Sequence, residues 1–122
     1  ERLVEITGDL KQVIKKYNPD LAVVEKIYFQ KNVKTAIGVA EARGVVLITL
    51  SEAGIPYLEP GPREVKLAVT GDGNADKRQI QDMLVRTLRL DEPPKPDDAA
   101  DALALALFGV VTTKLSEAIP KH

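Results

Sequence analysis

The sequence has no cysteine and no tryptophan, and its single histidine, His122, is the last residue. Without cysteine there is no disulfide framework, no thiolate nucleophile and no cysteine-based zinc site. A lone terminal histidine argues against a catalytic imidazole, so acid–base or metal chemistry must fall to carboxylates and lysines. No stretch approaches 18 consecutive apolar residues, which argues against a membrane span.

A strong excess of charge of either sign is also missing, because the formal net charge is -1 at pH 7. A protein that binds nucleic acid through a wholly basic surface would carry many more lysines and arginines. Residues 15–43 and 63–89 each hold a mild excess of cations over acids. Composition alone favours solvated faces over a binding groove for both regions.

The length of 122 residues corresponds to one small domain or a piece of one. The chain begins with Glu1 rather than methionine, and it begins inside a helical pattern. We therefore expect residues 1–122 to form a single domain that is the C-terminal portion of a longer polypeptide.

Hydrophobic periodicity and turn residues predict the secondary structure. Helices are predicted over 1–17, 32–53, 62–69 and 75–90, and from Pro96 to about 113, with short strands over 21–24 and 55–60. The continuous apolar run 21–24 suits a buried, parallel strand. This order is an α/β pattern, but two strands are too few for a sheet core. The shortage is a second indication that further strands precede Glu1.

The helix predicted over 32–53 has two apolar stripes, whereas a surface helix needs one. The first contains Val33, Ile37, Ala40, Gly44 and Leu47, and the second contains Val39, Ala42, Val46, Leu50 and Ala53. One side can face the sheet. The other faces either the rest of a larger core or a partner chain, and the small residues Ala40 and Gly44 favour the partner.

Three acidic residues are candidates for a site. Glu25 follows a buried strand, where open α/β sheets place their sites, and it is equally well read as an edge residue. Asp98 and Asp101 are three apart, so they share one face at the start of a helix. Carboxylate oxygens suit Mg²⁺. A pair of acids at a helix start more often caps the helix and compensates its dipole, and spacing alone favours that interpretation.

Several segments, taken in order, resemble the RuvC family of Holliday-junction resolvases. They are Leu21-Ala22-Val23-Val24-Glu25-Lys26-Ile27-Tyr28 with Lys31-Asn32, Ala42-Arg43-Gly44-Val45, Val65-Lys66 with Gly71-x-Gly73 and Lys77, and Asp98-Ala99-Ala100-Asp101-Ala102-Leu103-Ala104. Each segment alone is loose, but their spacings match across nearly the whole chain.

The resemblance implies a ribonuclease-H-like α/β fold and a homodimer that cuts two symmetric strands of a four-way DNA junction by two-metal hydrolysis. Four acidic positions of the family hold two Mg²⁺ ions per subunit. Glu25, Asp98 and Asp101 match the second, third and fourth of these catalytic positions. The family's dimer interface corresponds to the helix over 32–53.

The resemblance also implies DNA contacts. Lys66 and Lys77 match lysines placed near the substrate backbone, and Tyr28 matches an aromatic position thought to stack on a base at the junction centre. A branch-migration complex is a further partner in this interpretation, and the expected location is the cytoplasm.

One departure from the family is large. Its first acid lies in a Gly-Ile-Asp-Pro-Gly-like motif on the first strand, and this sequence contains no such motif. We therefore expect a truncated fold, a parent protein that resolves junctions, and no cleavage by these 122 residues alone. Two alternatives stay open: a non-catalytic junction-binding dimer, and another ribonuclease-H-like nuclease that acts on RNA or replication intermediates.

Overall fold

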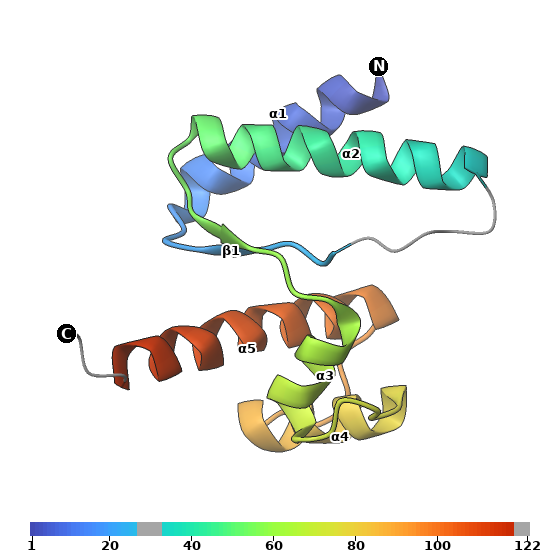
Figure 1. Ribbon diagram of the computed structural model, residues 1–122, viewed down its shortest axis with the longest axis vertical. Coiled ribbons are helices and arrows are strands. Elements are labelled where there is room, and N and C mark those ends of the chain that lie inside the picture. The colour runs from blue at the N-terminus through green and yellow to red at the C-terminus, as the bar shows by residue number, and fades with distance from the viewer. Residues whose placement is uncertain (27–32, 119–122) are drawn as a thin grey trace. The chain divides into compact units, whose positions relative to one another are not determined.

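The computed structural model describes residues 1–26 and 33–118. The chain divides into two compact units. Unit 1 comprises Glu1–Ala22 and Ile27–Tyr57, and unit 2 comprises Val23–Lys26 and Leu58–His122. Figure 1 labels the helices of both units. Tyr28, to which the family resemblance gives a base-stacking role, lies outside the described residues.

Unit 1 is built from two helices that pack against each other, α1 (Arg2–Tyr17) and α2 (Val33–Glu52) (Figure 1). The Glu1 carboxylate caps α1 by accepting a hydrogen bond of 2.8 Å from the Leu3 amide. Asn18 ends the helix in the left-handed conformation, with φ 46°. The helix predicted over 1–17 is thus confirmed.

Helix α2 buries Thr49 and Leu50 close to its C-terminal end. The Thr49 hydroxyl donates to the Val45 carbonyl at 2.7 Å, so the buried polar group is satisfied. Gly54 follows with φ 74°, the conformation that glycine supplies beyond helix ends. The prediction over 32–53 agrees with the observed helix within one residue at each end.

Two short strands, β1 (Ala22–Val23) and β2 (Tyr57–Leu58), form a two-stranded sheet. The amides of Ala22, Val24 and Lys26 donate to the carbonyls of Pro56, Leu58 and Pro60, at 3.0, 2.9 and 2.8 Å. Donor and acceptor numbers rise together, so the strands are parallel. Both predicted strands are present, though shorter than predicted, and the parallel orientation expected for the first is confirmed. Its predicted burial is not, because the residues of β1 are only partly buried.

In its described residues, unit 2 has three helices around one core: α3 (Pro62–Thr70), α4 (Lys77–Leu88) and α5 (Asp97–Ala118) (Figure 1). The buried core residues are Val65, Val69, Leu84, Ala100 and Ala104. The small side chains on α5 let α3 and α4 pack closely against it. Pro62 is the first residue of α3, where its missing amide costs no hydrogen bond.

Helix α4 is shorter than the predicted segment 75–90. A capping box starts it: the Asp76 carboxylate accepts from the Gln79 amide, and the Gln79 side chain accepts from the Asp76 amide, both at 2.8 Å. Arg89 ends the helix with φ 55°. Thr87 and Leu88 in its last turn are exposed.

Within the described residues, α5 is the helix that is long and apolar enough to cross a membrane, over Asp97–Ser116. A core helix passes the same test of length and composition. Ala100 and Ala104 are 3% and 4% exposed because they pack against α3 and α4. Three aspartates also lie in its first two turns.

Candidate metal and nucleic-acid site

Glu25 lies two residues after the end of β1, on a segment that is hydrogen-bonded on both sides of it. The Val24 amide donates to the Leu58 carbonyl, and the Lys26 amide donates to the Pro60 carbonyl. These bonds fix the backbone on either side of Glu25, while its side chain is exposed. The structure therefore places this acid at the carboxyl end of a parallel strand, as the sequence predicted.

One pocket in unit 2 is lined by Glu25, Lys66 and Asp101 together. They come from the end of β1, from α3 and from α5. Its other lining residues are Pro62, Val65, Ile80, Ala104 and Leu105. Apolar side chains thus form most of the wall, and the three charged groups supply its polar chemistry. Two of the three predicted acids and one predicted lysine share this pocket.

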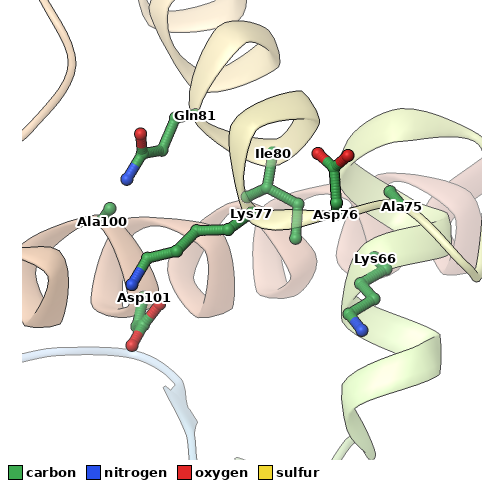
Figure 2. Close-up of a pocket in the computed structure, with 8 residues that line it drawn as sticks. All are labelled: Lys66, Ala75, Asp76, Lys77, Ile80, Gln81, Ala100 and Asp101. Atoms are coloured by element: carbon green, nitrogen blue, oxygen red, sulfur yellow. The ribbon is translucent and has the colours of Figure 1, made fainter.

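A neighbouring pocket shares Lys66 and Asp101 and adds Lys77 from the start of α4 (Figure 2). Ala75, Asp76, Ile80, Gln81 and Ala100 complete its lining. In Figure 2 the Lys77 side chain extends from α4 toward Asp101 on α5. Asp101 therefore belongs to a hollow that both predicted DNA-binding lysines line.

Lys77 forms an ion pair with Asp97, with 2.5 Å between Nζ and Oδ2. The hydrogen bond to Asp97 raises the pKa of Lys77 above 10.5, and the negative charges of Asp97, Asp101 and Asp98 act in the same direction. Partial desolvation opposes the shift. The two paired side chains are 60% and 65% exposed, so water screens much of their attraction.

Sequence reasoning missed Asp97. Its position directly before Asp98, in the first turn of α5, was a visible signal for a charged neighbour of the site. Nothing in the sequence paired it with Lys77, which lies 20 residues earlier. Only the packing of α4 beside α5 brings the two side chains together.

Asp98 is exposed on the first turn of α5 and lines neither of the two pockets. Across residues 1–26 and 33–118, no three His, Cys, Asp or Glu side chains come close enough to hold a metal ion. The three-carboxylate site therefore stays a prediction. The donor chemistry fits nonetheless, because Mg²⁺ commonly uses one or two carboxylates with waters and substrate phosphates, and Glu25 and Asp101 face one pocket.

Comparisons with known proteins identify the family. The family model described as crossover junction endodeoxyribonuclease RuvC matches residues 1–109. A relative of that name from Prochlorococcus marinus (strain MIT 9313) is 50% identical over 109 residues, which cover 89% of this chain and 70% of the relative. One from Roseiflexus sp. (strain RS-1) is 52% identical over 107 residues, which cover 88% of this chain and 64% of the relative.

Solved structures give the same result. The structure of Thermus thermophilus RuvC matches with a TM-score of 0.85 and 34% identity, over 94% of this chain and 69% of that one. The same protein in complex with a Holliday junction substrate matches with a TM-score of 0.87 and 34% identity, over 94% and 70%. The expected ribonuclease-H-like α/β class is thereby confirmed. The chain belongs to the RuvC family of crossover junction endodeoxyribonucleases.

Proposed function

We propose that this protein resolves four-way DNA junctions during recombination and repair, by metal-dependent hydrolysis of phosphodiester bonds. The observation that carries the proposal is the pocket that Glu25, Lys66 and Asp101 line together. It offers two carboxylates for a cation and one ammonium group for a phosphate. The RuvC structure that resembles this chain was solved with a Holliday junction substrate, which supports the choice of substrate.

The metal in this proposal is Mg²⁺, two ions per subunit, held by Glu25, Asp98 and Asp101. When bound, such ions lower the pKa of a water molecule and stabilise the leaving oxygen of a phosphodiester. Glu25 supplies its carboxylate from a backbone fixed by parallel-strand hydrogen bonds. Asp98 and Asp101 lie one turn apart on α5 and would supply the carboxylates from that helix.

Lys66 and Lys77 contact DNA phosphates in this proposal. Both line the pocket that contains Asp101, so they flank the place where a scissile phosphate would lie. Contacts of this kind position the DNA strand without reading its bases. Tyr28, which lies outside the described residues, is proposed to stack on a base at the junction centre.

We also propose a homodimer through the helix predicted over 32–53. Ile37 and Ile48 on α2 are 54% and 59% exposed, and the small residues Ala40 and Gly44 are exposed between them. Their spacing over three helical turns places these four residues on one face. A two-fold partner would bury this stripe and present two sites to two symmetric strands. A branch-migration complex and a cytoplasmic location belong to the same proposal.

The test is a cutting assay with the full-length protein and Mg²⁺ on four-way junctions, plain duplexes and RNA–DNA hybrids. We expect cutting of the junction, and we expect Glu25→Gln and Asp98→Asn to abolish cutting while junction binding survives. Lys114→Ala is the control, because this exposed residue is 13 positions from Asp101 on α5, about 20 Å along the helix. Preferential cutting of RNA–DNA hybrids would instead indicate another ribonuclease-H-like nuclease.

A non-catalytic junction-binding dimer is the second candidate. It is favoured by the finding that no three potential ligands cluster within the part of the chain that the structure describes. In that case the full-length protein would bind four-way junctions tightly, and neither Mg²⁺ nor Mn²⁺ would produce nicks.

A further inference from the structure

We propose that Arg63 is a positioning residue that fixes the separation between Lys66 and Lys77. It does so by clasping the loop Gly71–Asn74, hereafter the 71–74 loop, to helix α3. The inference rests on the proposed function, in which the two lysines contact phosphates. Arg63 itself is assigned no contact with DNA.

The contacts of Arg63 carry the proposal. Its Nη1 donates a hydrogen bond of 2.8 Å to Oδ1 of Asn74. A Cβ atom added at Gly73 would lie 2.9 Å from Cγ of Arg63 and 3.1 Å from its Cζ and Nε. The Arg63 side chain therefore runs directly over Gly73, and only glycine leaves room for it there.

The requirement at Gly73 concerns space rather than backbone conformation. Gly54 and Gly71 have positive φ angles of 74° and 83°, whereas Gly73 is outside that left-handed region. Alanine at position 73 is thus compatible with the backbone. It would act by displacing Arg63, which makes this glycine a useful probe of the clasp.

The 71–74 loop connects the contact with Arg63 to the start of α4. The Asp72 amide donates to the Thr70 hydroxyl at 3.0 Å, and the Asn74 amide donates to the Asp72 carboxylate at 2.8 Å. The capping box of Asp76 then starts α4 at Lys77. The Ala75 amide also donates to the Asp72 carbonyl at 3.1 Å, so hydrogen bonds hold the loop up to the residue directly before the cap of α4.

Both lysines lie a short distance along the chain from the contact between Arg63 and Asn74. Lys66 lies three residues, about one helical turn, beyond Arg63 on α3, and Lys77 lies three residues beyond Asn74. Figure 2 shows the two lysines coming from α3 and α4 into the same pocket. Two lysine side chains that bind one DNA strand must match the spacing of its phosphates. In a site of this kind, a misplacement of about 1 Å greatly lowers the reaction rate.

The experiment measures affinity for a four-way junction between 50 and 200 mM salt (about the range in which phosphate contacts dominate), using full-length protein without divalent metal. Arg63→Ala should weaken binding about fivefold, the value expected for one ordinary hydrogen bond, with the slope of log affinity against log salt unchanged. Lys66→Ala should reduce that slope by about 0.9, as each lost phosphate contact does. A slope reduced in Arg63→Ala as in Lys66→Ala would show direct phosphate binding and overturn the proposal, as would unchanged affinity.

Gly73→Ala provides the second test through a double-mutant cycle. It should weaken binding as Arg63→Ala does, and it should cost nothing further in the Arg63→Ala background. Arg63→Lys keeps the charge, but its ammonium nitrogen ends about one bond short of the Nη1 atom that bonds Asn74, so it should behave like Arg63→Ala. Equal losses from Gly73→Ala in both backgrounds, or full affinity in Arg63→Lys, would contradict the clasp.

Hydrogen exchange of the free protein separates this inference from the proposed function. Arg63→Ala should speed amide exchange in the 71–74 loop and at the start of α4, and Gly73→Ala should do the same. If Lys66→Ala and Lys77→Ala left junction binding intact, the phosphate role would fail even though this exchange effect persisted. Unchanged exchange in both variants would instead refute the clasp itself.

Discussion

The two units of the chain differ in how they use apolar side chains. Unit 2 encloses a core in which Leu84 is fully buried and Val65, Val69, Ala100 and Ala104 are nearly so. Exposed apolar side chains occur in both units, but in unit 1 none of the described residues of α1 is buried, and Ile37 and Ile48 share one exposed face of α2 with Ala40 and Gly44.

This difference suits the two units to different roles in the proposed function. The charged residues of the proposed site stand on helices that a closed core holds in place, which is what a site of defined geometry requires. The exposed stripe on α2 is the kind of surface that another chain covers. In the proposed function, metal and phosphate binding therefore belong to unit 2 and dimer contacts to unit 1.

The largest expected effect is on catalysis. Asp101 lines both pockets of unit 2, so Asp101→Asn should lower the rate of junction cutting by about 10³-fold or more, the equivalent of several kcal/mol of metal-assisted stabilisation. Asp82→Asn on α4 removes an equal charge from an exposed position that lines neither pocket. Cutting rates are measured in single turnovers. Similar losses of rate in both variants would show that cutting depends on the total charge of the protein and not on the position of Asp101.

The free energy of unfolding should fall more when a buried leucine is truncated than when an exposed leucine is truncated. Leu84→Ala should lower the free energy of unfolding by about 3 kcal/mol, because a fully buried leucine leaves a cavity. Leu67→Ala on α3 is the matched control, since Leu67 is 55% exposed, and it should cost less than about 1 kcal/mol. Urea titration measures both, and equal losses would contradict the core assignment.

The assembly role of unit 1 can be tested with a charge on the exposed stripe. Ile48→Glu should weaken dimerisation by more than about tenfold, because a carboxylate would be desolvated in an apolar interface. The same change at Leu67 in unit 2 should leave the dimer intact. Sedimentation velocity measures how much of each variant is dimeric. A dimer that survives Ile48→Glu but not Leu67→Glu would place the interface in the other unit.

The smallest expected effect concerns Asp97. The hydrogen bond that Lys77 donates to Asp97 raises the pKa of Lys77 above 10.5. The ion pair is therefore complete at neutral pH and is lost only as the pH rises through that raised pKa. Asp97→Asn should lower that pKa and leave neutral-pH stability almost unchanged, since both groups are exposed. NMR titration of the Lys77 side chain measures the shift, and an unchanged pKa would show that the pair is absent in solution.

Much of the fold was predictable because its signals are local. Apolar spacing and turn residues located the five helices of the described residues, and the apolar run before Glu25 located β1. The end of α4 was misplaced because its last turn, with Leu88, continues the apolar spacing although it points to solvent.

The site was less predictable because its contacts are tertiary. Glu25 and Asp101 are far apart in the sequence, and they came together in the prediction through a family resemblance rather than through spacing. The pairing of Lys77 with Asp97 depends on how α4 packs beside α5, and the contact of Arg63 with Gly73 depends on how a loop folds back. Periodicity carries no information about either contact.

The central claim is that the acids of unit 2 hold the metal, and paramagnetic broadening by Mn²⁺ tests it most directly. In ¹⁵N spectra of the full-length protein, substoichiometric Mn²⁺ should first broaden the amides around Glu25, Asp98 and Asp101, and Asp101→Asn should remove that effect. First broadening at other acids, such as Asp72 or Glu52, with the residues around Asp101 unaffected, would contradict the account.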